Sequence, residues 1–330
     1  MRYFRLKHVS VCFVFGTALI FSGGVSCRPQ TGTSEPAAAP TSAPSKEQLL
    51  QLGKATFDPG APTELKVKKA WTGHLLVRPV VNGHPAGWFI FDTGAGVCCV
   101  TSSSVAELGL EQMGAIEAAG VGNEANAPVH RSRELVLGPL HCAGHPLMAV
   151  DLAFLEQHLG DKVSGIIGFG VLSRCVAVID LQRATISLHD PAQYKLPRGE
   201  WTALDLSGRA PVITAVFEGH EGRFLLDTGD HAHVVFDEPA VRKWKLLENR
   251  ELTDIKLGGV GGFIAAKNGK IAKLEVAGLV LEDVPASFAL EAKGAHAQTN
   301  RAGRLGAGVL KRFVLVVDYG RQRMALLARE

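Results

Sequence analysis

Short apolar runs broken by turn-forming residues dominate the chain after about residue 63. Each run spans roughly 4–8 residues and Gly, Pro, Asn or Asp separate them, a pattern that predicts the strands of a mostly antiparallel, all-β protein. The clearest strand candidates are residues 75–81, 88–91, 134–137, 176–180 and 184–188. Helical patterns are few and short, at residues 47–54, 105–110 and 240–247.

The pattern repeats itself within the chain. Asp92 and Asp227 each end an apolar run, each is followed by Thr-Gly, and they are 135 positions apart. Residues 165–180 resemble residues 303–318 at an offset of 138, with matching glycines, apolar residues and final aspartate. An offset that changes so little indicates one fold used twice.

The N-terminal segment has a different pattern. Three basic residues precede an apolar run at residues 9–21, which is shorter than the roughly 20 residues of a membrane-spanning helix. This pattern predicts a signal peptide over residues 1–26. Residues 27–62 begin rich in Pro, Ala, Ser and Thr and predict a flexible tether. We expect an N-terminal lobe over residues 63–197 and a C-terminal lobe over residues 198–330.

The residues around the expected cleavage point resemble a bacterial lipobox. In that motif a cysteine is lipidated and becomes the first residue, and here Cys27 follows Gly24-Val25-Ser26. Gly24 stands where the motif usually has leucine, so secretion after cleavage elsewhere is the alternative. Arg28 differs from the aspartate that resembles an inner-membrane retention signal. We therefore expect a periplasm-facing lipoprotein of the outer membrane.

Charge and cysteine content narrow the expected partners. The formal charge of +3 falls to zero without residues 1–26, which hold three basic and no acidic residues. A neutral mature chain gives no electrostatic reason to expect nucleic acid as a partner. Cys98, Cys99, Cys142 and Cys175 form no C-x-x-C zinc pattern and predict core packing, with one disulfide left open.

The two acidic turns are the candidate site. One isolated Asp-Thr-Gly is ordinarily a turn in which the aspartate caps the backbone. Two copies at matching points of a repeat indicate instead that Asp92 and Asp227 meet. Two carboxyls within a few Å share one proton, which leaves one base and one acid. Such a pair can activate water and protonate an amide carbonyl, with no metal and no cofactor.

The small residues of these turns have expected supporting roles. Gly94 and Gly229 permit tight turns and a close approach of the two lobes. The hydroxyls of Thr93 and Thr228 can bond one lobe to the other.

At these residues the sequence resembles the retropepsin-like aspartic proteases more closely than the pepsins. The resemblance lies in F-D-T-G-A at 91–95, L-D-T-G at 226–229, and the support elements Ile166-Ile167-Gly168 and Arg304-Leu305-Gly306. It covers about residues 66–328. It implies two pseudo-twofold-related β-barrel lobes with a central cleft that binds an extended peptide, here within one chain that has no need to dimerise.

Glycine-flanked segments in both halves resemble the flaps of that family, which close on substrate. They are Gly120-Val121-Gly122 and Gly259-Val260-Gly261, and neither contains tyrosine. Two such segments favour two flaps, as in retropepsins. Plain hairpin turns are the alternative.

The second half departs from the family pattern at two positions. Asp230 follows the second Asp-Thr-Gly, where Ala95 follows the first, and Arg304 replaces an apolar support residue. A third carboxylate would shift the titration of the pair upward. Alternatively, Asp230 points away and pairs with Arg223 or His231. A catalytically decayed, peptide-binding lipoprotein is therefore the alternative to an active endopeptidase.

A third hypothesis concerns metal binding. Asp227, Asp230, His231 and His233 form a D-x-x-D-H-x-H pattern that could ligate a transition metal. If this segment were a strand, the two histidines would share a face. Our main expectation is no metal, with a peptide or protein as the substrate of an aspartic endopeptidase.

Overall fold

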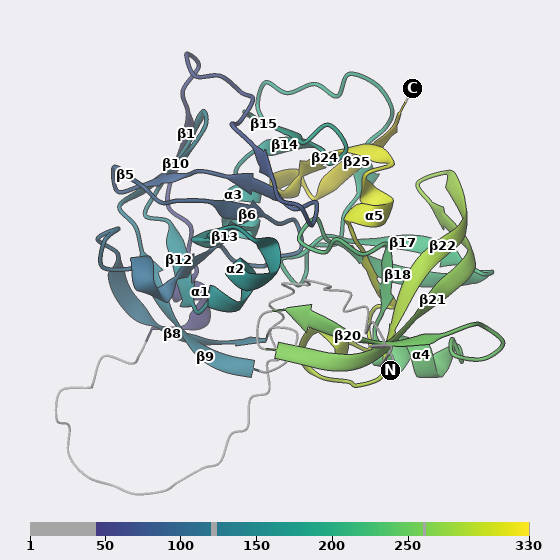
Figure 1. Cartoon of the computed structure of the whole chain (residues 1–330). Helices are drawn as coiled ribbons and strands as arrows, with labels where there is room; N and C mark the ends of the chain where they lie inside the picture. Colours follow the sequence, from purple (N-terminus) through teal and green to yellow (C-terminus); the bar gives the residue numbers. More distant parts are fainter. Residues whose placement is uncertain (1–43, 120–123, 260–261, 330) are drawn as a thin grey trace, which may run out of the picture.

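Two sheet-rich halves make up the protein, as the sequence predicts. The computed structural model describes residues 44–119, 124–259 and 262–329. Figure 1 shows one half built from the strands up to β15 and the other built from β16 onward, side by side. The prediction of a mostly β, bilobal fold is confirmed.

The elements of the first half are short. They are α1 (Lys46–Leu49), β1 (Ala55–Phe57), β2 (Lys68–Lys69), β3 (Leu75–Val77), β4 (Val80–Val81), β5 (His84–Pro85), β6 (Phe89–Phe91), β7 (Cys99–Thr101), η1 (Ser102–Ser104), β8 (Glu111–Ala119), β9 (Glu124–Arg131), β10 (Glu134–Leu137), β11 (Leu140–Ala143), β12 (Pro146–Val150), α2 (Ala153–Leu159), β13 (Gly165–Ile167), α3 (Phe169–Leu172), β14 (Val176–Asp180) and β15 (Thr185–His189).

The second half contains longer hairpin strands. Its elements are β16 (Thr202–Ala203), β17 (Val212–Phe217), β18 (His220–Leu226), β19 (Val234–Phe236), α4 (Glu238–Lys243), β20 (Thr253–Gly259), β21 (Gly262–Val276), β22 (Leu279–Ala289), η2 (Gly294–His296), β23 (Gly303–Leu305), α5 (Ala307–Leu310), β24 (Phe313–Asp318), η3 (Tyr319–Arg321) and β25 (Arg323–Ala328).

The main sheets of the two halves share an order of seven strands, and the first sheet has β2 as an additional edge strand. In the first sheet the order is β2-β3-β6-β13-β7-β12-β9-β8, and in the second it is β17-β18-β23-β19-β22-β21-β20. In each sheet the support strand, β13 or β23, runs parallel to the strand that carries the aspartate and antiparallel to its other neighbour. The internal repeat in the sequence is thus a repeat of topology and register.

A third sheet joins the two halves. Its order is β15-β14-β24-β25-β16, so two strands from the first half pair with three from the second. In the register of β14 with β24, Val176 lies opposite Asp318 and Ile179 opposite Leu315. This shared sheet holds the two halves at a fixed distance, which is what a site built between them requires.

Several sequence predictions are corrected at the level of single elements. The expected strand 75–81 is broken into β3 and β4 around Pro79, because proline has no backbone N–H to donate to a ladder. Residues 105–110 form turns after η1 rather than a regular helix. The helix expected at 240–247 begins two residues earlier, as α4, where Pro239 occupies its first turn.

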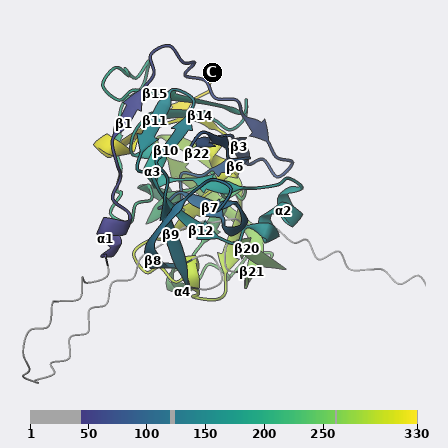
Figure 2. The same cartoon turned by 90° about the vertical axis from the view of Figure 1, so that its left-hand side faces the viewer.

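Part of the expected tether is folded. Strand β1 pairs with β11, and the Arg131 guanidinium donates hydrogen bonds to the carbonyl oxygens of Gln51, Leu49 and Gln48. Leu49 and Leu50 are buried against the first half, and Figure 2 shows α1 at the outer edge of that half. Packing therefore begins well before residue 63, because residues 46–57 bring apolar side chains that the Pro- and Ala-rich stretch lacks.

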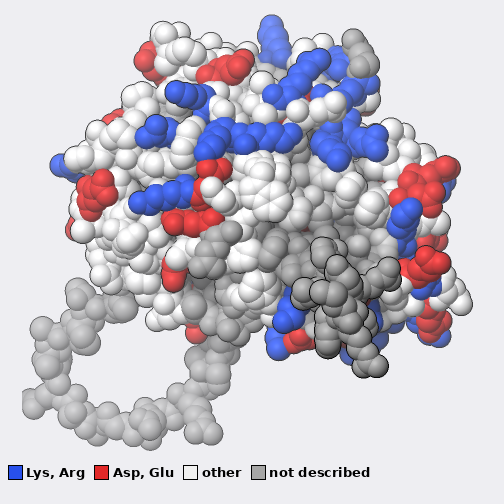
Figure 3. Space-filling model, in the orientation of Figure 1, with Lys and Arg blue, Asp and Glu red and all other residues white. Residues whose placement is uncertain are grey.

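The surface carries both signs of charge. On the face drawn in Figure 3, basic side chains gather in the upper part, and acidic side chains lie close to them. None of the helices in the described part of the chain has the length and apolarity needed to cross a bilayer.

Candidate active site

The two acidic turns meet at the boundary between the halves. Each follows the strand that pairs in parallel with the support element: Asp92 N donates to Ile167 O at 2.9 Å, and Asp227 N donates to Leu305 O at 3.0 Å. The aspartates are only 1% and 0% exposed. Parallel pairing with β13 or β23 therefore carries each carboxyl to the same depth on both sides of the boundary.

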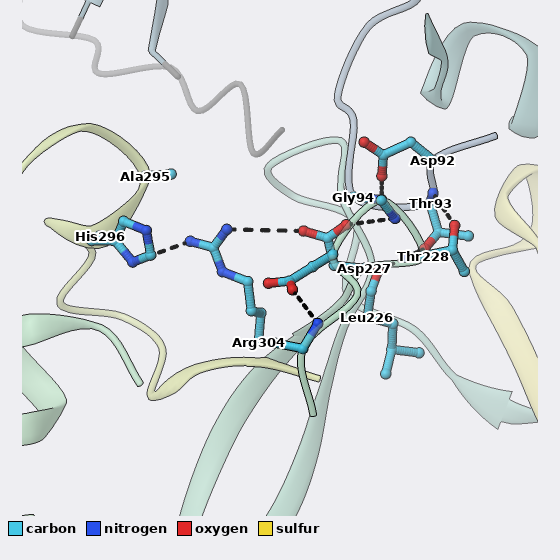
Figure 4. A network of polar contacts seen from close by, with 12 residues as sticks. Asp92, Thr93, Gly94, Leu226, Asp227, Thr228, Ala295, His296 and Arg304 are labelled. Atoms are coloured by element: carbon cyan, nitrogen blue, oxygen red, sulfur yellow. Dashed lines mark hydrogen bonds and ion pairs between the residues drawn. The ribbon is translucent and has the colours of Figure 1, made fainter. Parts of the chain in front are cut away.

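A symmetric set of hydrogen bonds locks the turns together. Thr93 N donates to Thr228 Oγ1, and Thr228 N donates to Thr93 Oγ1, both at 3.0 Å. Thr93 Oγ1 donates to Leu226 O at 2.8 Å, and Thr228 Oγ1 donates to Phe91 O at 2.9 Å. Each threonine thus bonds the opposite half, as the sequence predicted for these hydroxyls, and Figure 4 shows the two turns in contact.

The glycines allow the carboxyls to approach the opposite backbone. A Cβ added to Gly94 would lie 2.7 Å from Asp227 Cγ, and one added to Gly229 would lie 2.5 Å from Asp92 Cγ. Any larger residue would push the halves apart. The amide of Gly94 donates to Asp92 Oδ1 at 2.7 Å, and that of Gly229 donates to Asp227 Oδ1 at 3.0 Å, so each carboxyl is also oriented by its own turn.

Burial and proximity change how the pair titrates. Loss of water raises the pKa of Asp92 well above its ordinary value, and the neighbouring Asp227 carboxyl raises it further. Burial also raises the pKa of Asp227, although the cation of Arg304 opposes that rise. Two interacting carboxyls without water hold one proton between them over a wide pH range.

A third buried carboxyl lies on the second turn. Asp230 is fully buried, its Oδ1 accepts from Ala232 N at 2.8 Å, and its Oδ2 makes no hydrogen bond within the described residues. Burial, and then Asp227, raise the pKa of Asp230 to about 7. Its alternative pairing with Arg223 is wrong, because Arg223 bonds the Asp205 carboxylate instead.

A network of ionic side chains lies beneath the second turn. Arg304 is completely buried, and its Nη1 is 3.9 Å from Asp227 Oδ2. Its Nη2 is 3.7 Å from Asp237 Oδ1 and 3.3 Å from His296 Nδ1. Asp237 in turn accepts from Arg301 Nε at 2.8 Å. The pKa of Asp237 lies below its ordinary value because these partners outweigh the effect of burial.

Two further residues at the site were not predicted from the sequence motifs. The Tyr319 hydroxyl donates to Thr93 O at 2.9 Å, and His74 Nε2 contacts Gly229 O at 3.0 Å. Each therefore supports the turn of the opposite half. The repeat gave one usable signal, since Tyr319 follows Asp318 at the position where Leu181 follows Asp180.

The expected flap segments follow β8 and β20 along the chain. Residues 120–122 of the first, and Val260 and Gly261 of the second, are outside the described residues. The strands leading to them pair antiparallel, β8 with β9 and β20 with β21, with Gly259 opposite Gly262. Just past the second hairpin's end, the Phe263 ring lies 6.1 Å from that of His158 on α2. The second hairpin thus reaches the first half.

The two histidines of the proposed metal pattern have different neighbours. They precede β19 rather than lying within a strand. The His231 ring faces His74 at 5.8 Å, whereas a Cβ on Gly308 in α5 would lie 2.5 Å from the His233 ring. Across the residues that the structure describes, no three His, Cys, Asp or Glu side chains form a group that could hold a metal ion.

The four cysteines of the described chain are buried thiols without a disulfide. Burial raises the pKa of Cys98 to about 11 and that of Cys142 to about 12. Cys98 Sγ accepts from Gly168 N at 3.3 Å, beneath the first acidic turn. Core packing, the main expectation for these residues, agrees with this arrangement.

Two β-sheet halves that each deliver a buried aspartate to a shared boundary define the class of two-lobed aspartic proteases. A comparison with protein families gives the same result, because the family described as aspartyl protease (Asp_protease_2) matches residues 77–171 and 213–309. The two segments cover more than half of the 330 residues and correspond to the two copies of the repeat. The chain belongs to this aspartyl protease family. No curated protein matches it.

Proposed function

We propose that this protein is an aspartic endopeptidase in which Asp92 and Asp227 activate one water molecule. The observation that supports this most directly is the symmetric bonding of Thr93 and Thr228, which holds two buried carboxyls together at the boundary between the halves. The proton shared by the pair provides both catalytic roles. The ionised carboxyl takes a proton from water, and the protonated one gives its proton to the carbonyl oxygen of the peptide.

The burial of the pair defines a further requirement. At 1% and 0% exposure, neither carboxyl is open to a peptide. Substrate binding therefore needs an opening above the turns. Once a peptide is enclosed, the absence of bulk water strengthens the interaction of the carboxyls with the reacting carbonyl.

The expected place of action is outside the cytoplasm. Residues 1–26 have the pattern of a signal peptide, and Cys27 is the expected lipidation site. We propose a periplasm-facing lipoprotein, with secretion as the alternative. Mass spectrometry of the mature N-terminus tests this: a diacylated Cys27 supports the anchor, and a free N-terminus at another residue contradicts it.

Single substitutions test the proposed chemistry. Asp92→Asn and Asp227→Asn should each abolish hydrolysis of a fluorogenic peptide library, with unchanged circular dichroism. The matched control is Asp151→Asn, which alters an exposed aspartate that accepts a hydrogen bond from Ala153 N in its own turn. A statine-type inhibitor should block the wild-type enzyme and a chelator should not. Full activity in either site variant would contradict the assignment.

The second candidate is a peptide-binding protein that has lost turnover. Its specific support is Asp230, a third buried carboxyl beside the pair. Asp230→Ser separates the two candidates. If the wild-type protein binds peptides without cleaving them and Asp230→Ser gains cleavage, the decayed enzyme is correct; if both cleave, Asp230 is a tolerated residue.

A further inference from the structure

The support strands beneath the two aspartates differ at one position. In β13, Ile166 lies opposite Ile90 of the aspartate-bearing strand, and in β23, Arg304 lies opposite Leu225. The repeat therefore places Arg304 where the first half has an apolar side chain. Arg304 is also the largest of the fully buried side chains in the described protein.

The contacts of Arg304 bring a positive charge to one member of the pair. Its Nη1 approaches Asp227 Oδ2 to 3.9 Å, and within the described residues neither atom has a hydrogen-bond partner. Figure 4 shows the guanidinium between His296 on one side and Asp227 on the other. Among the described residues that shift the pKa of Asp92 there is no cation, and its support strand has Ile166 at the position of Arg304.

The charges of the buried network favour a negative charge on Asp227. Arg301 and Arg304 supply two positive charges, and Asp237 with its lowered pKa supplies one negative charge. His296 is neutral near pH 7, since burial and then Arg304 lower its pKa to about 4. A second negative charge is needed for neutrality, and besides Asp237 it is Asp227 that lies at ion-pair distance from Arg304.

We infer that Arg304 is a positioning residue that fixes the negative charge of the catalytic pair on Asp227 and leaves the proton on Asp92. This inference rests on the proposed endopeptidase function and assigns its two roles. Asp227 takes a proton from water as the water oxygen bonds to the peptide carbonyl carbon. Asp92 gives its proton to the carbonyl oxygen, which forms a neutral gem-diol and leaves Asp227 protonated and Asp92 ionised.

Other groups around Asp227 do not provide this asymmetry. Several titratable groups interact electrostatically with Asp227 or with Asp92. Besides the two aspartates themselves they are Asp230, Arg301, Arg304, Tyr319 and Cys99. Burial raises the pKa values of Tyr319 and Cys99 well above their ordinary ranges, so both are neutral near pH 7. Arg301 bonds Asp237 directly, and it lowers the pKa of Asp227 less than Arg304 does.

The burial of Arg304 is difficult to explain by stability alone. A fully buried cation loses its hydration, and apolar replacements of buried ion pairs are often neutral or stabilising. Its Nε and Nη1 also lack hydrogen-bond partners among the described residues. A role in the charge distribution of the site accounts for this placement, because the unsatisfied Nη1 is the atom nearest Asp227.

The first experiment compares pH profiles of kcat/KM on one peptide. Arg304→Met removes the charge at similar length, Arg304→Lys retains it, and Ile166→Met is the matched change in the first half. Removing the cation should move the acidic limb upward by about one pH unit or more. The lysine variant should keep that limb near the wild-type position, and so should Ile166→Met. A purely structural role would lower rates without moving the limb.

A second readout needs no turnover and so separates this inference from the proposed function. In protein labelled with ¹³C at aspartate carboxyls, the NMR signal lost in Asp227→Asn identifies Asp227. At pH 6 this signal should be that of a carboxylate, and Arg304→Met should raise its titration midpoint by about one unit. If the wild-type protein cleaves no peptide, the proposed function fails but this titration still decides the role of Arg304.

Two results would overturn the inference. One is a labelled Asp92 that is ionised at pH 6 while Asp227 is protonated. The other is an Arg304→Met variant whose Asp227 titrates as in the wild type. If Arg304→Met does not fold, Arg304→Gln provides the same neutral test with a polar side chain that can still bond His296.

Discussion

The two acidic turns make equivalent hydrogen bonds, but the side chains beneath them differ. At each turn, threonine bonds the opposite half and a glycine amide bonds the local aspartate. Beneath the first turn lie Ile166 and Cys98, both buried and apolar. Beneath the second lie Arg304 and the Asp237 carboxylate. The bonds that join the halves are thus symmetric, and the electrostatic surroundings are not.

This difference indicates that the two carboxyls of the duplicated site have different roles. A twofold-symmetric pair of carboxyls has no preferred location for its single proton. Two halves in one chain can differ in sequence, so one member of the pair can acquire a cation that the other lacks. The asymmetry then resides in the support strand, where it leaves the geometry of the turns unchanged.

The largest expected loss of stability comes from removing the Asp237 carboxylate, the anion of the buried network in the second half. Asp237→Ala leaves Arg301 and Arg304 buried without their shared carboxylate, which should cost about 3–5 kcal/mol of unfolding free energy. Thr101 occupies the matching position, since it precedes η1 as Asp237 precedes α4. Thr101→Ala should therefore cost less than about 1 kcal/mol. Urea unfolding of both variants measures the difference, and equal losses would show that the network is not what distinguishes the halves.

The next effect should be the same in both halves. Thr93→Val and Thr228→Val each remove one donated and one accepted hydrogen bond across the boundary. Each unsatisfied buried group costs about 1–3 kcal/mol, and each variant leaves two such groups, so it should lose at least about 2 kcal/mol. Thr214→Val, on an exposed strand position, is the control. Thermal unfolding should give equal losses for the two site variants, and a twofold or larger difference would contradict a symmetric joint.

A third prediction concerns pH. Burial raises the pKa of Asp230 to about 7 from 3.8, so the native state holds a proton that the unfolded chain releases. Stability should consequently be greatest below about pH 4 for this group and fall as pH rises towards 7, by up to about 1.4 kcal/mol per pH unit. Asp230→Asn should flatten that slope, measured by urea unfolding from pH 4.5 to 7. Asp151→Asn should leave it unchanged, and an unchanged slope in Asp230→Asn would exclude the buried acid.

The sequence predicted the shared parts of the two halves better than their differences. Residues 92–94 and 227–229 identify the paired turns because they recur at matching points, and the repeat also implies the common strand order. Arg304 was visible as a departure from an apolar pattern. Its contact with Asp237 could not be predicted, because Asp237 is 59 positions from His296 and still farther from Arg304, and the three residues belong to no shared motif.

Local composition explains the other errors. The Pro- and Ala-rich pattern of the tether was extended to residue 62, although residues 46–57 form α1 and β1 on the first half. A short segment becomes ordered through tertiary contacts, such as those of Arg131 with the carbonyls at and just after the end of α1, and hydrophobic periodicity does not record these. The same limit applies to Tyr319, whose hydroxyl bonds a residue 226 positions away.

The smallest expected effect belongs to that tyrosine. Tyr319 from the second half donates to Thr93 O, while the matching first-half residue, Leu181, is apolar and buried. Tyr319→Phe keeps the ring against Phe169 and removes one hydrogen bond, so it should cost about 1 kcal/mol. Tyr194→Phe, on a half-buried tyrosine away from the site, is the control. If the bond also orients the first turn, kcat of Tyr319→Phe should fall while KM stays constant. A lower stability with unchanged kcat would limit Tyr319 to joining the halves.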